Sequence, residues 1–344
     1  RVGRCSMQLS DFDYLLPAER IAQVPIEPRD AARLLVLDRA TDRLGHWHVS
    51  DLPELLRPGD LLVANRSRVL PARVGGLLKG GGRAELLLLR RLAPARWEAL
   101  CRPARRLRRG DEVRVGDGLT VTVDEVRPEG LREISVLTTA GGTDPDAALL
   151  AAGSTPLPPY IRGWAGDPER YQTVFADTAG SAAAPTAGLH LTNALIERLR
   201  ARGVDFATVV LHIGLDTFRP VSEADPRAHR IHREWCVVPP ETRENIARAR
   251  QRGGRVVAVG TTVVRTLETW AATGQAEGWT NLFILPGHQF ATIDALITNF
   301  HLPQSTLLLL VSAFAGRERV LEAYENAIRN QYRFYSFGDA MLIV

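Results

Sequence analysis

The chain has 344 residues, 45% of them hydrophobic, so it is long enough for two domains and can bury a sizeable core. This composition excludes disorder along most of its length. Its 43 basic and 39 acidic side chains leave a net charge of only +4, which permits a polyanionic partner without requiring one. Lys79 is the only lysine, so any phosphate-binding surface has to be built from arginine.

Cysteine usage and hydropathy indicate a cellular compartment. Cys5, Cys101 and Cys236 are far apart and form no CxxC pair, so we expect neither a disulfide framework nor a zinc ribbon. No apolar signal peptide is visible, and the longest apolar run, 307–315, is too short to span a bilayer. We therefore expect a cytoplasmic protein without a membrane partner, whose fold begins at Met7, the first methionine.

From Asp60 to about Thr139, short apolar strings are separated at even spacing by turns such as Gly80-Gly81-Gly82 and Asp117-Gly118. This spacing predicts a small antiparallel β-barrel. A segment rich in Gly, Ala, Asp and Pro follows at 140–159, and we expect it to be the linker that leaves the barrel.

After this linker, strands and helices alternate. Thr192 is the expected N-cap of a helix that Gly203 ends, and the apolar string "VDFATVVLHIG" predicts a buried strand after it. Further strands are expected at "RVVAVG" and "NLFILPG". Further helices are expected at Pro240–Arg252, Leu307–Ala315 and Arg317–Gln331.

The predicted fold class is therefore α/β, with a larger α/β domain and an inserted small antiparallel β-barrel domain. Residues 7–60 and 156–344 are assigned to the α/β catalytic domain. Residues 61–155 are assigned to the barrel.

One strand-to-helix turn resembles an anion site. The string "VAVGTTVVRTLE" contains one glycine instead of GxGxxG, so an ordinary dinucleotide or methyltransferase loop is poorly supported, and no P-loop motif occurs in the chain. The backbone N–H groups of Thr261 and Thr262 at the helix start would still suit a carboxylate or phosphate. The alternative is that Thr262 only caps its own helix.

A second cluster has the residue types of a metal site. The string "HRIHREWC" brings together His229, His232, Glu234 and Cys236. Their spacing does not share one helix face, and no distant partner is identifiable. We interpret the cluster as a hydrogen-bonding polar loop and predict no metal.

Positive charge is concentrated in "RPARRLRRG", which we call the arginine segment, Arg102–Gly110. It could follow an RNA backbone, or it could be a solvated face, and the sequence leaves both open. The candidate RNA-binding residues are Arg102, Arg105, Arg106, Arg108 and Arg109.

Polar residues also interrupt the most apolar strings. His190 ends "GSAAAPTAGLH", His212 lies in "VVLHIG", and Asp294, Asn299 and His301 lie in "DALITNFHLPQSTLLLL". Because α/β folds build their sites where strands end, these side chains are candidate site residues.

At these residues the chain resembles the S-adenosylmethionine:tRNA ribosyltransferase-isomerase family. The resemblance extends from "LSDFDYLLPAERIAQVP" to "YRFYSFGDAMLIV" and includes "PLPPYIR", "ERYQTVFA", "AAPTAGLH" and "DALITNFHLPQSTLLLLVSAFAG". The resemblance implies an α/β domain with an inserted barrel. It further implies transfer and isomerisation of the ribosyl part of S-adenosylmethionine, a co-substrate. The acceptor would be 7-aminomethyl-7-deazaguanine at the wobble position of tRNA, and epoxyqueuosine, adenine and methionine would form. We expect a monomer that binds the anticodon stem-loop without a metal.

This chemistry implies roles for the candidates. His190 and His212 are candidate acids or bases, because imidazole titrates near neutral pH. Arg265 is a candidate for binding the methionine carboxylate or a phosphate. The base or the ribose hydroxyls would be bound by Asp294, Asn299 and His301. The other candidate substrate-binding residues are Thr261, Thr262, Tyr160 and Thr186.

Five positions depart from the usual family strings. Arg66 and the serine after it replace Asp-Thr, Asp216 replaces glycine, Val263 replaces serine, and Ala291 replaces a basic residue. Asp216 adds a charge and a side chain beside a candidate histidine. A divergent relative acting on a free deazapurine or another nucleoside therefore stays open, as do a non-catalytic RNA-binding protein and a conventional methyltransferase.

Overall fold

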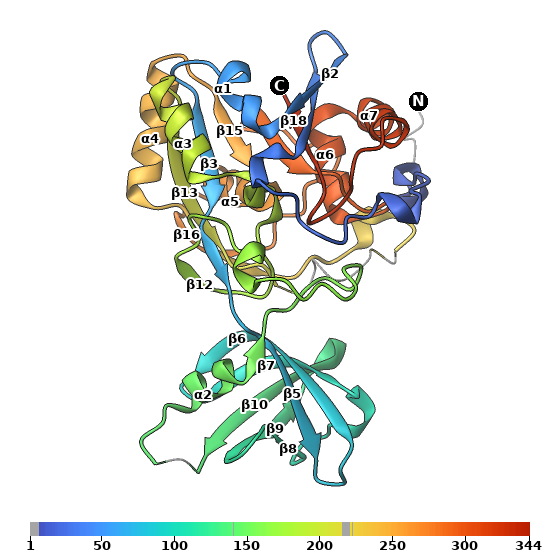
Figure 1. The fold of residues 1–344 in the computed structure, drawn as a ribbon, viewed down its shortest axis with the longest axis vertical. Coiled ribbons are helices and arrows are strands. Elements are labelled where there is room, and N and C mark those ends of the chain that lie inside the picture. The colour runs from blue at the N-terminus through green and yellow to red at the C-terminus, as the bar shows by residue number, and fades with distance from the viewer. Residues whose placement is uncertain (1–6, 140, 215–220, 222) are drawn as a thin grey trace. The chain divides into compact units, whose positions relative to one another are not determined.

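The structure is a computed structural model that describes residues 7–139, 141–214, 221 and 223–344. The chain divides into two compact units (Figure 1). The α/β unit consists of Arg1–Ser67, Pro159–Thr178 and Ala184–Val344. The barrel unit consists of Arg68–Pro158 and Ala179–Ala183.

A mixed sheet forms the centre of the α/β unit. Its strands are β1 (Arg33–Asp38), β2 (Arg43–His48), β3 (Leu61–Asn65), β13 (Asp205–Leu211), β14 (Glu234–Val237), β15 (Val256–Val259), β16 (Glu277–Thr280), β17 (Ala295–Asn299) and β18 (Ala340–Ile343). Within the described residues, the order of these nine strands is β16-β14-β13-β3-β15-β17-β18-β1-β2. The central strands β13, β3, β15 and β17 are parallel to one another. Their carboxyl ends therefore meet at one edge of the sheet.

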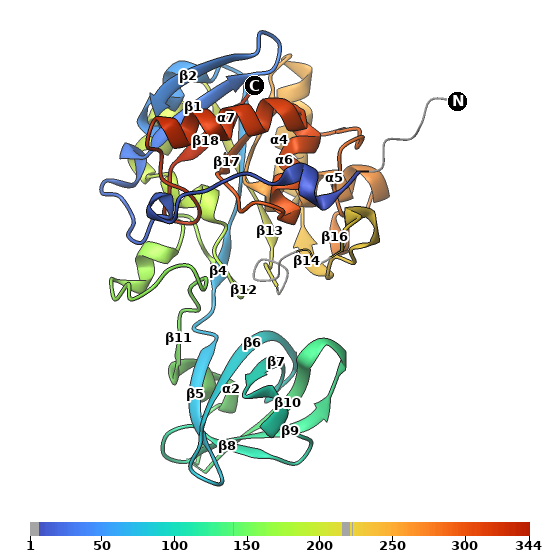
Figure 2. The same ribbon diagram turned by 90° about the vertical axis from the view of Figure 1, so that its right-hand side faces the viewer.

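Helices cover both faces of this sheet (Figures 1 and 2). They are α1 (Leu52–Leu55), α3 (Asn193–Ala201), α4 (Pro240–Gln251), α5 (Thr261–Thr273), α6 (Thr306–Ala315) and α7 (Arg317–Arg329). Side chains of a strand alternate between its two faces, so Leu61 and Val63 of β3 enter the core with α4 to α7. Leu62 and Ala64 enter the other core, with α1 and α3. Because the central strands are buried on both faces, their sequences are continuously apolar and do not alternate between apolar and polar residues.

Strands of the barrel unit close into an antiparallel barrel. They are β5 (Arg73–Leu78), β6 (Arg83–Ala93), β7 (Arg96–Arg102), β8 (Glu112–Arg114), β9 (Leu119–Val126) and β10 (Leu131–Thr138). They pair in the order β5-β6-β7-β10-β9-β8, and a further pairing of β5 with β8 closes the ring. The short strands β4 (Ser67–Val69) and β12 (Thr178–Ser181) pair with each other, and β11 (Gly153–Ser154) pairs with β5.

The predicted fold class is confirmed, an α/β domain with an inserted small antiparallel barrel. Thr192 caps α3 as expected, because its Oγ1 accepts a hydrogen bond from the Leu195 N–H at 3.0 Å. The closing helices also lie close to their predicted positions, and α7 packs on β1 (Figure 2). No helix among the described residues is both long and apolar enough to cross a membrane.

Three details of the expected layout are wrong. Leu61–Asn65, assigned to the barrel, is a central strand of the large sheet, as its complete burial requires. The expected linker contains a helix, α2 (Pro145–Ala151), which Asp144 caps and whose Leu149 enters the barrel core. The string "NLFILPG" at 281–287 forms no strand. The strand is instead β16 just before it, which pairs with β14.

Candidate active site

A pocket of about 710 Å³ opens at the carboxyl ends of the parallel strands. Ile213 follows β13, Gly260 follows β15, and Thr298 and Asn299 end β17, and all four line the pocket. The volume is in the range of small-molecule sites, and this edge is where open α/β sheets bind ligands. Every lining residue belongs to the α/β unit.

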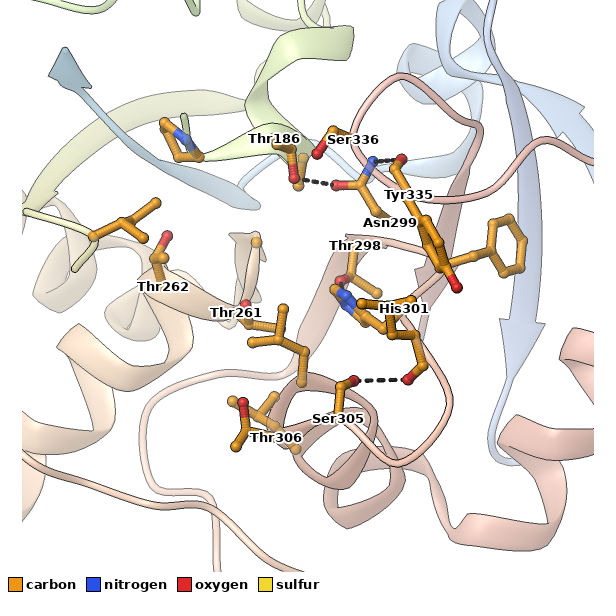
Figure 3. Close-up of a pocket in the computed structure, with 18 of the residues that line it drawn as sticks. Thr186, Thr261, Thr262, Thr298, Asn299, His301, Ser305, Thr306, Tyr335 and Ser336 are labelled. Carbon is orange, nitrogen blue, oxygen red and sulfur yellow. Dashed lines mark hydrogen bonds between the residues drawn. The ribbon is translucent and has the colours of Figure 1, made fainter. Parts of the chain in front are cut away.

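Two helices begin at this pocket (Figure 3). α5 starts at Thr261 directly after Gly260, whose φ of +95° is in the region that favours glycine. α6 starts at Thr306 and is capped by Ser305, whose Oγ accepts from the Leu308 N–H at 3.2 Å. The first N–H groups of a helix have no partner within it and carry partial positive charge. The pocket is thus favourable for an anionic group.

A buried ion pair forms part of the pocket wall. One guanidinium nitrogen of Arg265, Nη1, contacts Glu234 Oε2, and Nε donates to the Leu282 carbonyl at 3.1 Å. Glu234 Oε1 accepts from the Gly214 N–H at 2.8 Å. The remaining nitrogen, Nη2, is buried and has no hydrogen-bond partner among the described residues. An unpaired guanidinium N–H beside a cavity fits an acceptor of the ligand, above all a carboxylate or phosphate oxygen.

Hydrogen bonds fix the orientation of Asn299. Its Oδ1 accepts from the Thr186 hydroxyl at 2.9 Å, and its Nδ2 donates to the Tyr335 carbonyl at 3.1 Å (Figure 3). The amide therefore presents a defined donor and acceptor at the pocket. Thr262 is held similarly, since its hydroxyl accepts from Asn65 Nδ2 at 3.3 Å and makes no cap bond to α5.

His301 brings an imidazole ring to the pocket (Figure 3). Its Nε2 forms a 2.7 Å hydrogen bond with the Thr298 hydroxyl, and its Nδ1 has no partner among the described residues. Burial lowers the pKa of His301 to about 3, so the ring is neutral at physiological pH. A neutral imidazole has one donor and one acceptor nitrogen, and it can recognise a nucleobase edge or a hydroxyl.

Aromatic rings form a further part of the wall. The rings of Tyr160 and Tyr335 are 4.9 Å apart, and the Tyr160 hydroxyl lies 2.6 Å from Ser336 Oγ. Burial raises the pKa of both tyrosines, so both phenols are neutral. Tyr335 has a φ of +70°, a strained value for this side chain, and such strain is concentrated at functional sites.

His190 and Asp294, two of the predicted site residues, lie outside the pocket lining and have structural contacts. His190 is fully engaged, with Nδ1 3.1 Å from the Ala187 carbonyl and Nε2 2.8 Å from the Gly338 carbonyl. Burial lowers the pKa of His190, and its contacts join two backbone segments instead of facing a ligand. Asp294 precedes β17 and accepts from the Val256 N–H and from Arg250. It thus lies at the end of the strand opposite Asn299.

His212 lies next to the pocket but is not among its described lining residues. It follows β13, beside Ile213, and its Nδ1 is 3.5 Å from Ser67 Oγ. Partial burial lowers the pKa of His212 below its usual value. Asp216, the departure expected to matter most, lies outside the described residues.

The other departures from the family strings are not among the residues that line the pocket. Val263 is buried in the core of the α/β unit. The Ala291 N–H donates to Glu268 at 2.9 Å, and Arg66 Nε is 3.5 Å from Asp177.

Of the four polar residues in the cluster at 229–236, Glu234 lines the pocket, a role that sequence reasoning did not assign to it. Glu234 faces the pocket, whereas His229 bonds Glu223 and Cys236 is a buried thiol whose pKa burial raises to about 11. Within the described ranges, no three His, Cys, Asp or Glu side chains are arranged to hold a metal ion. Sequence reasoning also missed Tyr14, whose hydroxyl donates to the His301 carbonyl, and the pair Tyr335 and Ser336.

The arginine segment lies entirely in the barrel unit, and none of its residues is among those that line the pocket. The side chains of Arg102, Arg105, Arg106, Arg108 and Arg109 are all exposed. Residues 68–158 contain fifteen basic and eleven acidic side chains, so the whole net charge of +4 belongs to the barrel.

Comparisons with known proteins agree with this architecture. A family model described as a queuosine biosynthesis protein matches residues 9–343. S-adenosylmethionine:tRNA ribosyltransferase-isomerase from Symbiobacterium thermophilum is 52% identical, over 98% of this chain and 100% of the relative. The protein of the same name from Moorella thermoacetica is 53% identical with the same coverage. The crystal structure of S-adenosylmethionine tRNA ribosyltransferase from Thermotoga maritima has a TM-score of 0.56 at 40% identity, covering 97% of this chain and 100% of that chain.

Proposed function

The chain belongs to the S-adenosylmethionine:tRNA ribosyltransferase-isomerase family of queuosine biosynthesis, and on this premise we propose its reaction. It transfers and isomerises the ribosyl part of S-adenosylmethionine onto 7-aminomethyl-7-deazaguanine at the wobble position of tRNA. Epoxyqueuosine forms in the tRNA, and adenine and methionine are released.

The observation that carries this proposal is the convergence of three anion-binding groups on one pocket. Arg265 Nη2 is unpaired, and the amino ends of α5 and α6 line the same cavity. A carboxylate is the anionic group of S-adenosylmethionine, and a guanidinium and helix amino ends are its preferred partners. Arg265 with the Thr261 and Thr262 backbone would thus hold the methionine end, and Glu234 would orient the guanidinium.

The nucleoside end requires hydrogen bonds and flat apolar surfaces. Asn299, held by Thr186, and the neutral ring of His301 supply directional donors and acceptors. Tyr160 and Tyr335 supply aromatic surface beside them. We assign these residues to the adenine and the ribose hydroxyls.

The carbon beside the sulfonium, C5′, must lose a proton, which requires a positioned base. His301 is a weak base, because burial lowers its pKa to about 3. His212 is the better candidate: it lies at the carboxyl end of β13, and its lowered pKa keeps it unprotonated at neutral pH. Once protonated, His212 would pass the proton on to the leaving adenine or to water.

The tRNA substrate requires a positively charged surface. The exposed arginines of the barrel, Arg102, Arg105, Arg106, Arg108 and Arg109, suit the phosphates of the anticodon stem-loop. Since the barrel has the entire net positive charge, we assign phosphate contacts to it and the chemistry to the α/β unit.

One incubation tests the proposed reaction. The protein is mixed with S-adenosylmethionine and tRNA that contains 7-aminomethyl-7-deazaguanine, and released adenine and methionine are quantified. Equal amounts of both products, dependent on this tRNA, are expected.

Each competing function gives another result. A non-catalytic RNA-binding protein would bind the tRNA without releasing adenine. A methyltransferase would release S-adenosylhomocysteine. A relative specific for a free nucleoside would release adenine with 7-aminomethyl-7-deazaguanosine but not with the tRNA.

A further inference from the structure

A buried arginine in the barrel lies directly beneath the arginine segment. Arg132 of β10 is 5% exposed and has no carboxylate partner among the described residues. Its guanidinium donates to three backbone carbonyls: Nε to Leu107 at 2.9 Å, Nη2 to Ala104 at 2.8 Å and Nη1 to Leu131 at 3.0 Å. Two of the three carbonyls belong to the arginine segment.

Other contacts hold the same backbone. Leu107, between two exposed arginines, is completely buried in the barrel core. The Arg108 N–H donates to Asp111 Oδ2 at 2.6 Å, and the Gly110 N–H donates to the Val123 carbonyl at 2.8 Å. The backbone of the segment is therefore fixed at several points, while its arginine side chains project into solvent.

A buried guanidinium is a costly way to fix a loop, because removing a charge from water is unfavourable and no carboxylate compensates here. An apolar side chain at position 132 would fill the core without this cost. The guanidinium is distinguished by its geometry: its planar set of donors can bind two carbonyls of one turn at the same time.

We propose that Arg132 is a positioning residue for RNA: it holds the arginine segment in the conformation that matches the phosphates of the tRNA. The proposal rests on the proposed RNA contacts of the segment. A fixed backbone lowers the entropy lost when the five arginines bind, so Arg132 strengthens binding without touching the RNA.

Substitutions distinguish two roles of Arg132: holding the backbone of the arginine segment in place, which we call bracing, and adding positive charge. Arg132→Lys keeps the charge but replaces the three spaced nitrogens that reach the three carbonyls by a single ammonium nitrogen, and Arg132→Gln loses both the charge and this geometry. Bracing predicts that each variant weakens tRNA affinity about tenfold, with kcat and the KM for S-adenosylmethionine unchanged. A pure charge effect would spare Arg132→Lys. Arg96→Gln is the matched control, because Arg96 is an exposed barrel arginine paired with Glu133 outside the segment.

A variant in the segment itself gives an independent test. Asp111→Ala removes the partner of the Arg108 N–H together with one negative charge. Electrostatics alone predicts tighter tRNA binding by this variant, whereas bracing predicts weaker binding. This test stays decisive if the Arg132 variants lose the barrel fold. Trypsin should also cleave within the segment faster in Arg132→Lys than in the wild type, as resolved by mass spectrometry.

The double variant Arg105→Ser/Arg106→Ser keeps the two proposals distinguishable. If it binds tRNA normally, the segment does not contact RNA and both proposals fail. If it binds weakly while folded Arg132→Lys and Asp111→Ala bind as the wild type does, bracing is rejected and the RNA contacts remain. Weak binding by all three variants supports both proposals.

Discussion

The pocket and the barrel each contain a buried arginine, and the two are satisfied in different ways. Arg132 in the barrel donates to three carbonyls, and none of its buried nitrogens lacks a hydrogen-bond partner. Arg265 in the pocket is paired with Glu234 and retains one unpaired buried nitrogen. A satisfied buried charge fixes the fold, whereas an unpaired donor beside a cavity indicates where a ligand acceptor belongs.

His190 and His301 differ in the same way, one fully hydrogen-bonded and the other not. His190 uses both ring nitrogens on backbone carbonyls, whereas His301 uses one and leaves the other at the pocket. The residue type alone therefore does not identify a site residue. Its remaining hydrogen-bonding capacity does.

The largest effect is expected for Arg265. Arg265→Met should lower kcat/KM more than about 100-fold and also destabilise the fold by about 3–5 kcal/mol, because Glu234 loses its buried partner. The double variant Glu234→Gln/Arg265→Met removes both charges and should regain stability but not activity. Urea unfolding and steady-state kinetics measure the two effects. Recovery of activity in the double variant would show that Arg265 serves only to neutralise Glu234.

The exposed barrel arginines come next. Arg105→Ser/Arg106→Ser should raise the KM for tRNA about tenfold and make the salt dependence of tRNA binding shallower by roughly 1–2 in slope. The control is Arg198→Ser/Arg202→Ser, which removes two exposed arginines from the end of α3. Equal losses in both double variants would contradict a specific role of the barrel.

A smaller effect is expected for Asn65, which does not line the pocket but binds Thr262, a residue that does. Its amide binds both backbone groups of Leu211, the Ser67 N–H and the Thr262 hydroxyl. Asn65→Ala should cost about 1–3 kcal/mol of stability, because buried partners lose their bonds. The KM for S-adenosylmethionine should rise about threefold as Thr262 loses its anchor. An unchanged KM in a destabilised variant would make Asn65 purely structural.

The smallest effect at neutral pH is that of His301 on stability. The pKa of His301 falls from its usual 6.5 to about 3 in the folded chain, so below pH 6.5 the unfolded chain binds a proton that the folded chain rejects. Stability should therefore fall as the pH falls from 6.5 towards 3, by up to about 1.4 kcal/mol per pH unit from this residue. His301→Gln should flatten the curve of melting temperature against pH, whereas His48→Gln at the surface should not. If the melting temperature of His301→Gln depended on pH as steeply as that of the wild type, the His301 ring would not be neutral in the folded chain.

The sequence predicted the architecture well because the strands and helices are strongly patterned. It failed at boundaries: Leu61–Asn65 is a central strand, although it continues without a break into the barrel strings. In the site, Asn299 and His301 were found because they end an apolar strand. Asp294 directly precedes the same strand, and five residue steps along an extended chain place it roughly 16 Å from Asn299.

The remaining errors concern contacts between residues distant in the chain. His190 is engaged by Gly338, and Glu234 belongs to the site through Arg265, 31 positions away in the sequence. Such partners leave no local pattern. Only the folded chain shows which polar side chains are satisfied and that Arg265, which lines the pocket, keeps an unpaired nitrogen.

The central claim is that Arg265 binds the carboxylate of S-adenosylmethionine. Calorimetric titration with S-adenosylmethionine and with its decarboxylated analogue tests it directly, in the wild type and in Glu234→Gln/Arg265→Met. We predict that the wild type binds the analogue about 100-fold more weakly, and that the double variant binds both compounds alike. The same discrimination in both proteins would contradict the claim.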